Sequence, residues 1–340
     1  MDWKMIIGGK SADASDGAVL NNYNPYTGEL IGTVPAATKE DVDLAIANAV
    51  EGQKEWAALR NDERDAIINK FLALYDEHAE ELAQLLSREG GKTISECRGE
   101  VGSVPLIFRA YMNAATMYGE TLPYNVERRN TSDIIFTSYE PLGVCVCVAP
   151  FNYPVSTMTN KVAPALCAGN SVIMKPASDT PMSIILYAQL MLEAGMPANT
   201  VQVITGSGSK VGKWITENEH VAAISLTGST AVGVKLQTDA SRHLQRVLLE
   251  LGGTIHVIVV RGGLYSIGEL GYAFLGIAHF LRSAVRRDAR TGTGLVDKID
   301  GLIRQIAILD IAVRQARRRF DGSRRITNVM MLLIARHQGL

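Results

Sequence analysis

Residues 143–178 read GVCVCVAPFNYPVSTMTNKVAPALCAGNSVIMKPAS, and this stretch decides the fold. Two apolar runs, 144–149 and 171–175, have the length of buried strands, and the segment 154–168 between them has the length of a helix. A strand, a helix and a second strand in this order form the unit that joins parallel strands by a helical crossover. The same alternation continues further along the chain, so we expect an α/β protein with a doubly wound, Rossmann-like parallel sheet. The remaining expected strands are 201–205, 222–226 and 247–251, and the remaining expected helices are 181–194, 210–217 and 231–239.

Upstream of this stretch, the chain predicts short strands followed by helices. Residues 5–35 contain short apolar runs separated by turn residues. Thr38 has the sequence context of a capping box and starts a segment of helical spacing. The same spacing recurs over 64–86, and a third helix is expected over 100–118, opening around Pro105. The sheet is therefore expected to carry an N-terminal helical segment.

The composition excludes several classes of protein. The 340 residues are 47% hydrophobic and 20% charged, which allows two or three globular domains. No apolar run reaches the ~18 residues of a membrane span, and the first residues lack the apolar core of a signal peptide. The 4 cysteines fit a reducing compartment, and the 6 scattered histidines lack metal-ligand spacing. We therefore expect a cytoplasmic protein with no membrane contact and no metal site.

The near-neutral net charge conceals a division of the chain. Residues 1–253 hold 20 Lys+Arg against 29 Asp+Glu, a charge of −9, and residues 254–340 hold 14 against 6, a charge of +8. The second part also has 13 Arg and 1 Lys, whereas the first has 9 Arg and 11 Lys. Three readings fit this change: out-of-frame translation, a natural replacement segment, or a diverged catalytic domain. No nucleic-acid-binding module surrounds the arginines, so we expect no nucleic-acid partner.

Two glycine-containing turns suggest a nucleotide site at the edge of the expected sheet. The segment 206–212 follows a strand and contains Gly208 and Gly212, in a loose version of the dinucleotide fingerprint. It also fits a simple strand-to-helix turn. Gly228 and Ser229 precede another helix, whose free N–H groups attract a pyrophosphate. A serine at this position is equally suited to capping the helix, and the spacing leaves both readings open.

Four motifs in order resemble the cofactor half of the aldehyde dehydrogenase superfamily. They are Phe151-Asn152-Tyr153-Pro154, Lys175-Pro176-Ala177-Ser178, Leu226-Thr227-Gly228-Ser229 and Leu249-Glu250-Leu251-Gly252-Gly253. The resemblance covers residues 1–253. It implies an N-terminal part of a cofactor-binding domain over 1–125, an oligomerisation arm with a strand over 126–142 and a Rossmann-like core over 143–253. The Arg-rich tail, 254–340, then stands in place of the catalytic domain.

The resemblance also implies a nicotinamide dinucleotide cofactor. Lys175 reaches the adenosine ribose in this family, and the position of Ser178 is often a glutamate that grips both ribose hydroxyls. Because Ser178 would not repel a 2′-phosphate and Lys175 is positively charged, we expect NADP, with NAD possible. The resemblance assigns further cofactor contacts to Phe151, Gly208, Gly212, Gly228, Ser229 and Leu251.

The catalytic residues that the resemblance implies are incomplete. Asn152 matches an oxyanion-hole donor, and Glu250 matches the general base that activates water to hydrolyse a thioester. The thiolate that forms this thioester should fall near residue 284, where the sequence reads Leu281-Arg282-Ser283-Ala284-Val285-Arg286. No cysteine follows Glu250 in the chain.

The earlier cysteines do not fill this gap. Cys145 and Cys147 fit a buried strand, Cys167 fits core packing, and Cys97 is expected to be an exposed thiol. By descent the chain is thus expected to be an NAD(P)-dependent oxidoreductase that turns a small aldehyde into a carboxylate, inactive without its nucleophile. The alternative is a non-catalytic NADP-binding remnant or interaction protein. Homo-oligomers of the family type are expected to be impaired.

Overall fold

The computed structural model describes residues 2–117 and 138–252, which all lie in one compact unit of the chain, Met1–Thr254. Most of the predicted oligomerisation arm, 126–142, and all of the predicted tail, 254–340, lie outside the described residues. The strands are β1 (Met5–Ile7), β2 (Lys10–Ala12), β3 (Val19–Tyr23), β4 (Leu30–Pro35), β5 (Val144–Val148), β6 (Ser171–Lys175), β7 (Val201–Val203), β8 (Val221–Ser229) and β9 (Arg246–Gly252). The helices are α1 (Lys39–Ala58), α2 (Asn61–Glu77), α3 (Ala79–Gly90), α4 (Ile94–Ala115), α5 (Pro154–Cys167), α6 (Met182–Glu193), α7 (Gly208–Thr216) and α8 (Thr230–Ala240).

The parallel sheet that the sequence predicts is confirmed. Its strands run in the order β7-β6-β5-β8-β9, and each pairs in parallel with its neighbour. The hairpin of β1 and β2 adds to the β7 edge in antiparallel orientation, and β3 pairs with β4 separately. The chain leaves β5 first toward β6 and later, through α7, toward β8, so the sheet is doubly wound with its switch point between β5 and β8.

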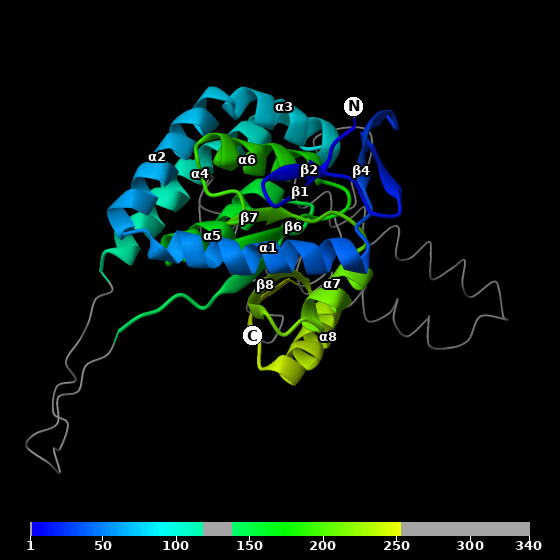
Figure 1. Ribbon diagram of the computed structural model, residues 1–340. Helices are drawn as coiled ribbons and strands as arrows, with labels where there is room; N and C mark the ends of the chain where they lie inside the picture. The colour runs from blue at the N-terminus through cyan, green and yellow to red at the C-terminus, as the bar shows by residue number, and fades with distance from the viewer. Residues whose placement is uncertain (1, 118–137, 253–340) are drawn as a thin grey trace, which may run out of the picture. The chain divides into compact units, whose positions relative to one another are not determined.

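Helices cover both faces of this sheet (Figure 1). On one face α5 and α6 pack against the sheet, and α2, α3 and α4 pack behind them. On the other face α1, α7 and α8 pack on the strands. The side chains of β5 alternate accordingly: Val144 and Val146 face the α1 layer, and Cys147 faces the α5 layer. Cys145, Cys147 and Cys167 are buried, as predicted.

The helical segment differs from its prediction in two places. The segment 64–86 belongs to two helices, α2 and α3, which meet at His78. The third helix, α4, begins at Ile94 and continues through Pro105 instead of opening there. Pro105 has no N–H to donate to the carbonyl of Val101, and the hydroxyl of Tyr75 donates to that carbonyl instead, at 3.2 Å. A donor from a neighbouring helix thus satisfies the group that the proline leaves free.

The longer α4 also corrects the expectation for Cys97. This thiol is buried, with 0% of the residue exposed, because the helix places it on the same inward face as Val101 and Val104.

The predicted capping box at the start of α1 is confirmed: the Thr38 side chain accepts from the N–H of Asp41, and the Asp41 carboxylate accepts from the N–H of Thr38.

Two buried glutamates from the N-terminal helices hold the starts of two crossover helices. Glu89, at the end of α3, accepts from the N–H groups of Met182 and Ser183 at 2.8 and 3.0 Å and from the Ser183 hydroxyl. Burial raises the pKa of Glu89 to about 7, and its hydrogen bonds to Ser183 and Met182 oppose the rise. Carboxylates at these positions also interact favourably with the positive ends of the helix dipoles.

Glu100 of α4 holds the start of α5 in the same way. It accepts from the N–H groups of Val155 and Ser156 at 2.8 and 3.1 Å, and it pairs with the ammonium of Lys92. That ammonium also lies 3.9 Å from the centroid of the Tyr153 ring. Both β-to-α loops on this face of the sheet are therefore fixed from outside the sheet.

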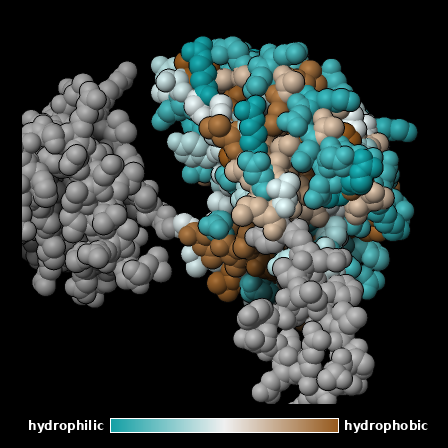
Figure 2. Space-filling model, turned by 90° about the vertical axis from the view of Figure 1, so that its left-hand side faces the viewer, coloured by the Kyte–Doolittle hydropathy of each residue, from teal (hydrophilic) through white to brown (hydrophobic). Residues whose placement is uncertain are grey.

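The described surface is largely polar on the face shown in Figure 2, where hydrophilic residues predominate. Among residues 2–117 and 138–252, no helix combines the length and apolarity needed to cross a bilayer. The aromatic side chains of Trp56, Phe71, Tyr75 and Phe108 in the helical segment are turned inward. Phe71 is in the centre of this packing, with its ring centroid 5.4–5.7 Å from those of Tyr75, Phe108 and Tyr187.

The cap on α6 predicts a specific loss of stability. Glu89→Ala leaves three buried donors without an acceptor, so we expect the free energy of unfolding to fall by about 3 kcal/mol. Chemical denaturation followed by the fluorescence of buried Trp56 measures this change. Glu81→Ala, at an exposed position of the same helix, serves as the control and is expected to cost less than about 1 kcal/mol. Equal losses in the two variants would contradict the role of Glu89.

Candidate active site

The carboxyl ends of β5, β6 and β8 border a cavity of about 270 Å³ beside α7 and α8. Its lining is mostly apolar, with Val148, Leu226 and Leu236 among the residues that form it. Gly208 and Gly212 line it from α7, and their contact with a cofactor stays a prediction. A Cβ atom at either glycine would meet no protein atom within 4 Å, so both leave open space. The cavity lies at the edge where doubly wound sheets bind nucleotides.

Lys175 gives this cavity a positive charge. The residue is 4% exposed, and its ammonium donates to the carbonyl of Pro176 at 2.7 Å. Burial lowers the pKa of Lys175 to about 8. Within residues 2–117 and 138–252, Lys175 forms no salt bridge. An anion that enters the cavity would therefore meet a cation that forms no ion pair with a carboxylate of residues 2–117 and 138–252.

Ser178 lies outside the lining of the cavity, on the loop that follows Lys175. It is exposed, and its hydroxyl donates to the carbonyl of Gly206 at 3.2 Å. Its own carbonyl accepts from the amide of Asn22 at 3.2 Å. The serine is thus held at both its side chain and its backbone.

Ser229 is the N-cap of α8. Its hydroxyl accepts from the N–H of Val232 at 3.4 Å, and this confirms the capping reading of the Gly228-Ser229 turn. The cap leaves other N–H groups of the first turn of α8 available to an anion. The phosphate contact at Ser229 stays a prediction.

Asn152 and Glu250 lie at the same edge of the sheet, two strands apart. Asn152 follows β5, and its side-chain oxygen accepts from the N–H of Tyr153 at 3.0 Å. Glu250 is exposed on β9 and pairs in register with Thr227 of β8. Buried Lys161 of α5 donates at 3.2 Å to the hydroxyl of Ser225 on β8, the strand between β5 and β9. Burial lowers the pKa of Lys161, while Cys147 and Glu250 act in the opposite direction.

The two remaining predicted cofactor residues have different surroundings. Phe151 is 62% exposed in the loop after β5. Leu251 packs against α8 so closely that a Cβ atom on Gly233 would lie 2.6 Å from its Cδ2 atom. Gly233 is therefore required for the close approach of α8 and β9 at Leu251.

The four thiols of the described residues are unsuited to nucleophilic attack. All are buried, and burial raises the pKa of Cys97, Cys145, Cys147 and Cys167, to about 12 for Cys145 and Cys167. The reactive form of a cysteine is the thiolate, which such surroundings disfavour. Groups of three or more potential metal ligands are also absent from the described ranges.

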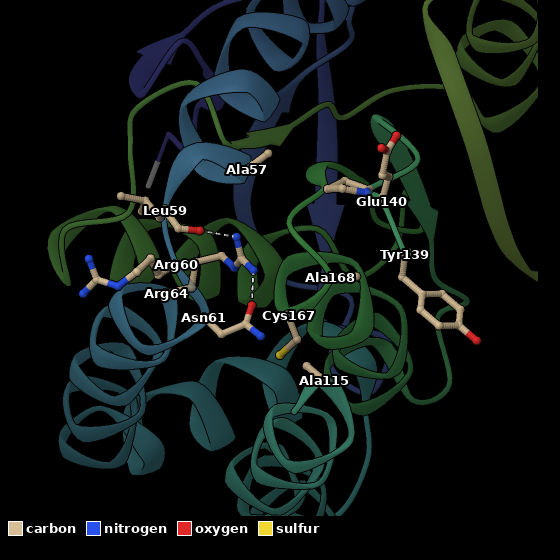
Figure 3. A pocket seen from close by; sticks show the side chains of 11 residues that line it. Ala57, Leu59, Arg60, Asn61, Arg64, Ala115, Tyr139, Glu140, Cys167 and Ala168 are labelled. Carbon is tan, nitrogen blue, oxygen red and sulfur yellow. Dashed lines mark hydrogen bonds between the residues drawn. The ribbon is translucent and has the colours of Figure 1, made fainter. Parts of the chain in front are cut away.

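A second cavity, of about 590 Å³, lies where α1, α2 and α5 meet. Figure 3 shows the guanidinium of Arg64 between Leu59 and Asn61, with Arg60 turned away from it. Arg64 donates to the carbonyl of Leu59 at 2.6 Å and to the side chain of Asn61. It also donates to the carbonyl of Trp56 at 3.4 Å, so its bonds join the end of α1 to the start of α2. This arrangement accounts for Arg64 as a structural residue.

A family profile described as "Aldehyde dehydrogenase family" matches residues 12–263. The chain belongs to the aldehyde dehydrogenase family. The match includes all four site motifs and ends close to the change in composition after Gly253.

Individual relatives agree with this assignment. The D-glyceraldehyde dehydrogenase (NADP(+)) of Picrophilus torridus is 36% identical over 259 residues, 74% of this chain and 50% of the relative. The succinate-semialdehyde dehydrogenase [NADP(+)] of Escherichia coli is 34% identical, over 75% of this chain and 52% of the relative. The crystal structure of an NADP-dependent enzyme of E. coli has a TM-score of 0.71 at 32% identity, over 74% of this chain and 52% of that one. The chain thus spans about half the length of the relatives it matches.

The cavity has features that would suit the adenosine end of NADP, the dinucleotide named for the Picrophilus torridus and Escherichia coli relatives. Apolar side chains on α7 and α8 suit a flat base, the Lys175 ammonium suits an anionic or hydroxyl group, and the start of α8 suits a phosphate. Sequence reasoning missed Lys213 and Lys235, which also line the cavity from α7 and α8. Lys235 pairs with Asp239 at 2.6 Å, at a spacing of four residues that the sequence does reveal.

A side chain at Gly212 should enter open space in the cavity, and so it should raise the stability of α7 and weaken dinucleotide binding. Gly212→Leu should stabilise α7, because leucine is a better helix former by roughly 0.5–1 kcal/mol. The new side chain should also occupy the cavity and weaken dinucleotide binding by about tenfold or more, as measured by calorimetric titration.

Gly99→Leu provides the matched control. Gly99 is an exposed glycine of α4, and a Cβ atom there also meets no protein atom within 4 Å. We expect the same gain in stability and unchanged binding. Unchanged binding in both variants would show that the dinucleotide does not occupy this cavity.

Proposed function

We propose that this chain binds a nicotinamide dinucleotide, NADP in preference to NAD, and does not oxidise aldehydes. The observation that carries the binding proposal is Lys175, a buried cation without a salt bridge in the described ranges, at the sheet edge where nucleotides bind. A 2′-phosphate is the group that distinguishes NADP, and it supplies negative charge. The names of the Picrophilus torridus and Escherichia coli relatives, which specify NADP(+), support the same preference.

Ser178 supports NADP for a second reason. A glutamate at this position would repel a 2′-phosphate, whereas a serine hydroxyl can donate to it. The hydroxyl now donates to Gly206, so it has to turn away from that carbonyl to meet a phosphate.

The rest of the proposed dinucleotide site lies along the starts of α7 and α8 and consists of Gly208, Gly212, Gly228 and Ser229. Phe151 and Leu251 are assigned to it by family likeness.

The remaining site residues indicate an aldehyde-oxidising ancestor. When bound, the cofactor supplies the group that accepts a hydride. Asn152 would donate its amide N–H to the oxygen of a bound aldehyde, and Glu250 would accept a proton from water at its carboxylate. Lys161, a buried cation of α5, donates to Ser225 of β8, the strand between β5 and β9. Asn152 would thus orient the aldehyde and Glu250 would move a proton, but the family reaction also needs a thiolate to attack the aldehyde carbon.

Two observations argue against turnover by this chain. The position expected for the nucleophile, near residue 284, has no cysteine, and none follows Cys167. The four thiols that are present are buried within the cofactor half. An active aldehyde dehydrogenase with other chemistry in 254–340 is the competing proposal, and the presence of Asn152 and Glu250 favours it. The coding DNA around Gly253 separates these proposals from an out-of-frame tail, because another frame would restore a cysteine about 34 residues further on.

The purified chain should bind NADP saturably and should not reduce it in the presence of an aldehyde. Calorimetric titration with NADP and NAD measures the first part, and NADPH absorbance with glyceraldehyde or succinate semialdehyde measures the second. Turnover that disappears in Glu250→Ala would contradict the inactive proposal. Absence of binding by both dinucleotides would contradict the cofactor proposal.

The affinity for NADP should fall as the pH rises through about 8. Burial lowers the pKa of Lys175 to about 8, so the lysine is cationic below this pH and neutral above it. Attraction to a 2′-phosphate is therefore present at pH 7 and largely lost at pH 9, while NAD binding should change less. Lys175→Met keeps the length of the side chain and should remove this pH dependence. A steady NADP affinity from pH 7 to pH 9 in the unaltered chain would contradict the proposed contact.

A further inference from the structure

The loop over 176–181, between β6 and α6, carries the groups proposed to meet the adenosine end of the cofactor. The ammonium of Lys175 bonds to the carbonyl of Pro176 in this loop, and Ser178 lies within it. The positions of both groups therefore depend on the path of the loop backbone. At its far end the loop is fixed by Glu89, which accepts from the N–H groups of Met182 and Ser183.

Asn22 fixes the middle of the same loop. It belongs to β3, outside the parallel sheet, and its amide donates to the carbonyl of Ser178 at 3.2 Å. Asn22 is 3% exposed, whereas its neighbours Asn21 and Tyr23 are exposed on the other face of β3. A buried amide that reaches a site loop 156 residues further along the chain is not needed for pairing of β3 with β4, which uses backbone groups.

Ser178 thus has two anchors, and the two cofactors would use them differently. A ribose 2′-hydroxyl can donate to the Ser178 oxygen while the serine still donates to Gly206, because a hydroxyl has one proton and two lone pairs. A 2′-phosphate accepts only, so Ser178 has to release Gly206 in order to donate to it. The hydrogen bond from the Asn22 side chain to the backbone carbonyl of Ser178 then still holds this residue.

We propose that Asn22 is a positioning residue that holds Ser178 in place when its hydroxyl turns to a 2′-phosphate, and so favours NADP over NAD. This inference rests on the proposed function of the cavity. It assigns part of the cofactor preference to a residue of the N-terminal segment, which does not line the cavity.

Asn22→Leu tests this role, because leucine has nearly the same shape and cannot donate to the Ser178 carbonyl. We expect the dissociation constant for NADP to rise by about fivefold, the effect of one hydrogen bond of roughly 1 kcal/mol. The constant for NAD should change by less than about twofold. Calorimetric titration of the full chain measures both. Asn21→Leu, the same replacement on the exposed face of β3, is the matched control and should change neither constant.

A second comparison separates positioning from a general loss of stability. In a Ser178→Ala background no hydroxyl can turn to the phosphate, so Asn22→Leu should there weaken NADP binding by less than about twofold. Denaturation midpoints of all variants are measured in parallel, and Asn22→Ser replaces Asn22→Leu if the latter does not fold.

The possible results have distinct meanings. Unchanged NADP binding in the Asn22 variant, or equal losses for NADP and NAD, would overturn the positioning role and leave the proposed function in place. An equal loss with and without the Ser178 hydroxyl would also overturn it. If the unaltered chain binds neither dinucleotide, the proposed function fails and this inference fails with it.

Discussion

The fold depends on two carboxylates that are buried at the starts of helices. Glu89 and Glu100 come from α3 and α4, and each accepts the free N–H groups of a crossover helix. These groups would otherwise be buried without partners at the edge of the sheet, which is costly. The N-terminal helices are therefore part of the architecture of the proposed nucleotide site, because the loops that they fix carry Asn152 on one side and Ser178 on the other.

Much of the fold could be predicted from the sequence because its signals are local. The apolar runs of β5 and β6 and the segment of helical spacing between them are complete within a few dozen residues. The prediction was wrong where a distant partner decides the local structure. Pro105 suggests a helix boundary, but the Tyr75 hydroxyl takes the place of the missing donor. Once α4 continues through Pro105, Cys97 becomes part of its buried face.

The candidate site shows the same division. The family motifs locate Lys175, Ser178, Asn152 and Glu250, and the parallel topology brings all four to one edge of the sheet. Their environment was not predictable, because it is formed by residues far along the chain. Glu89 did leave one signal: it continues the inward stripe of Leu82 and Leu86 at helical spacing, where a charge requires a buried partner.

The sheet order also determines how late during synthesis the first strand, β1, can join the sheet. The hairpin of β1 and β2 adds to β7, where Ile6 pairs with Val203. At roughly 5–20 residues per second, the ribosome needs about 10–40 s to make the intervening chain. During that interval the apolar strand β1 has no sheet edge to join. The early hairpin is thus a point at which a nascent chain is exposed to aggregation and to chaperones, long before the parallel sheet is complete.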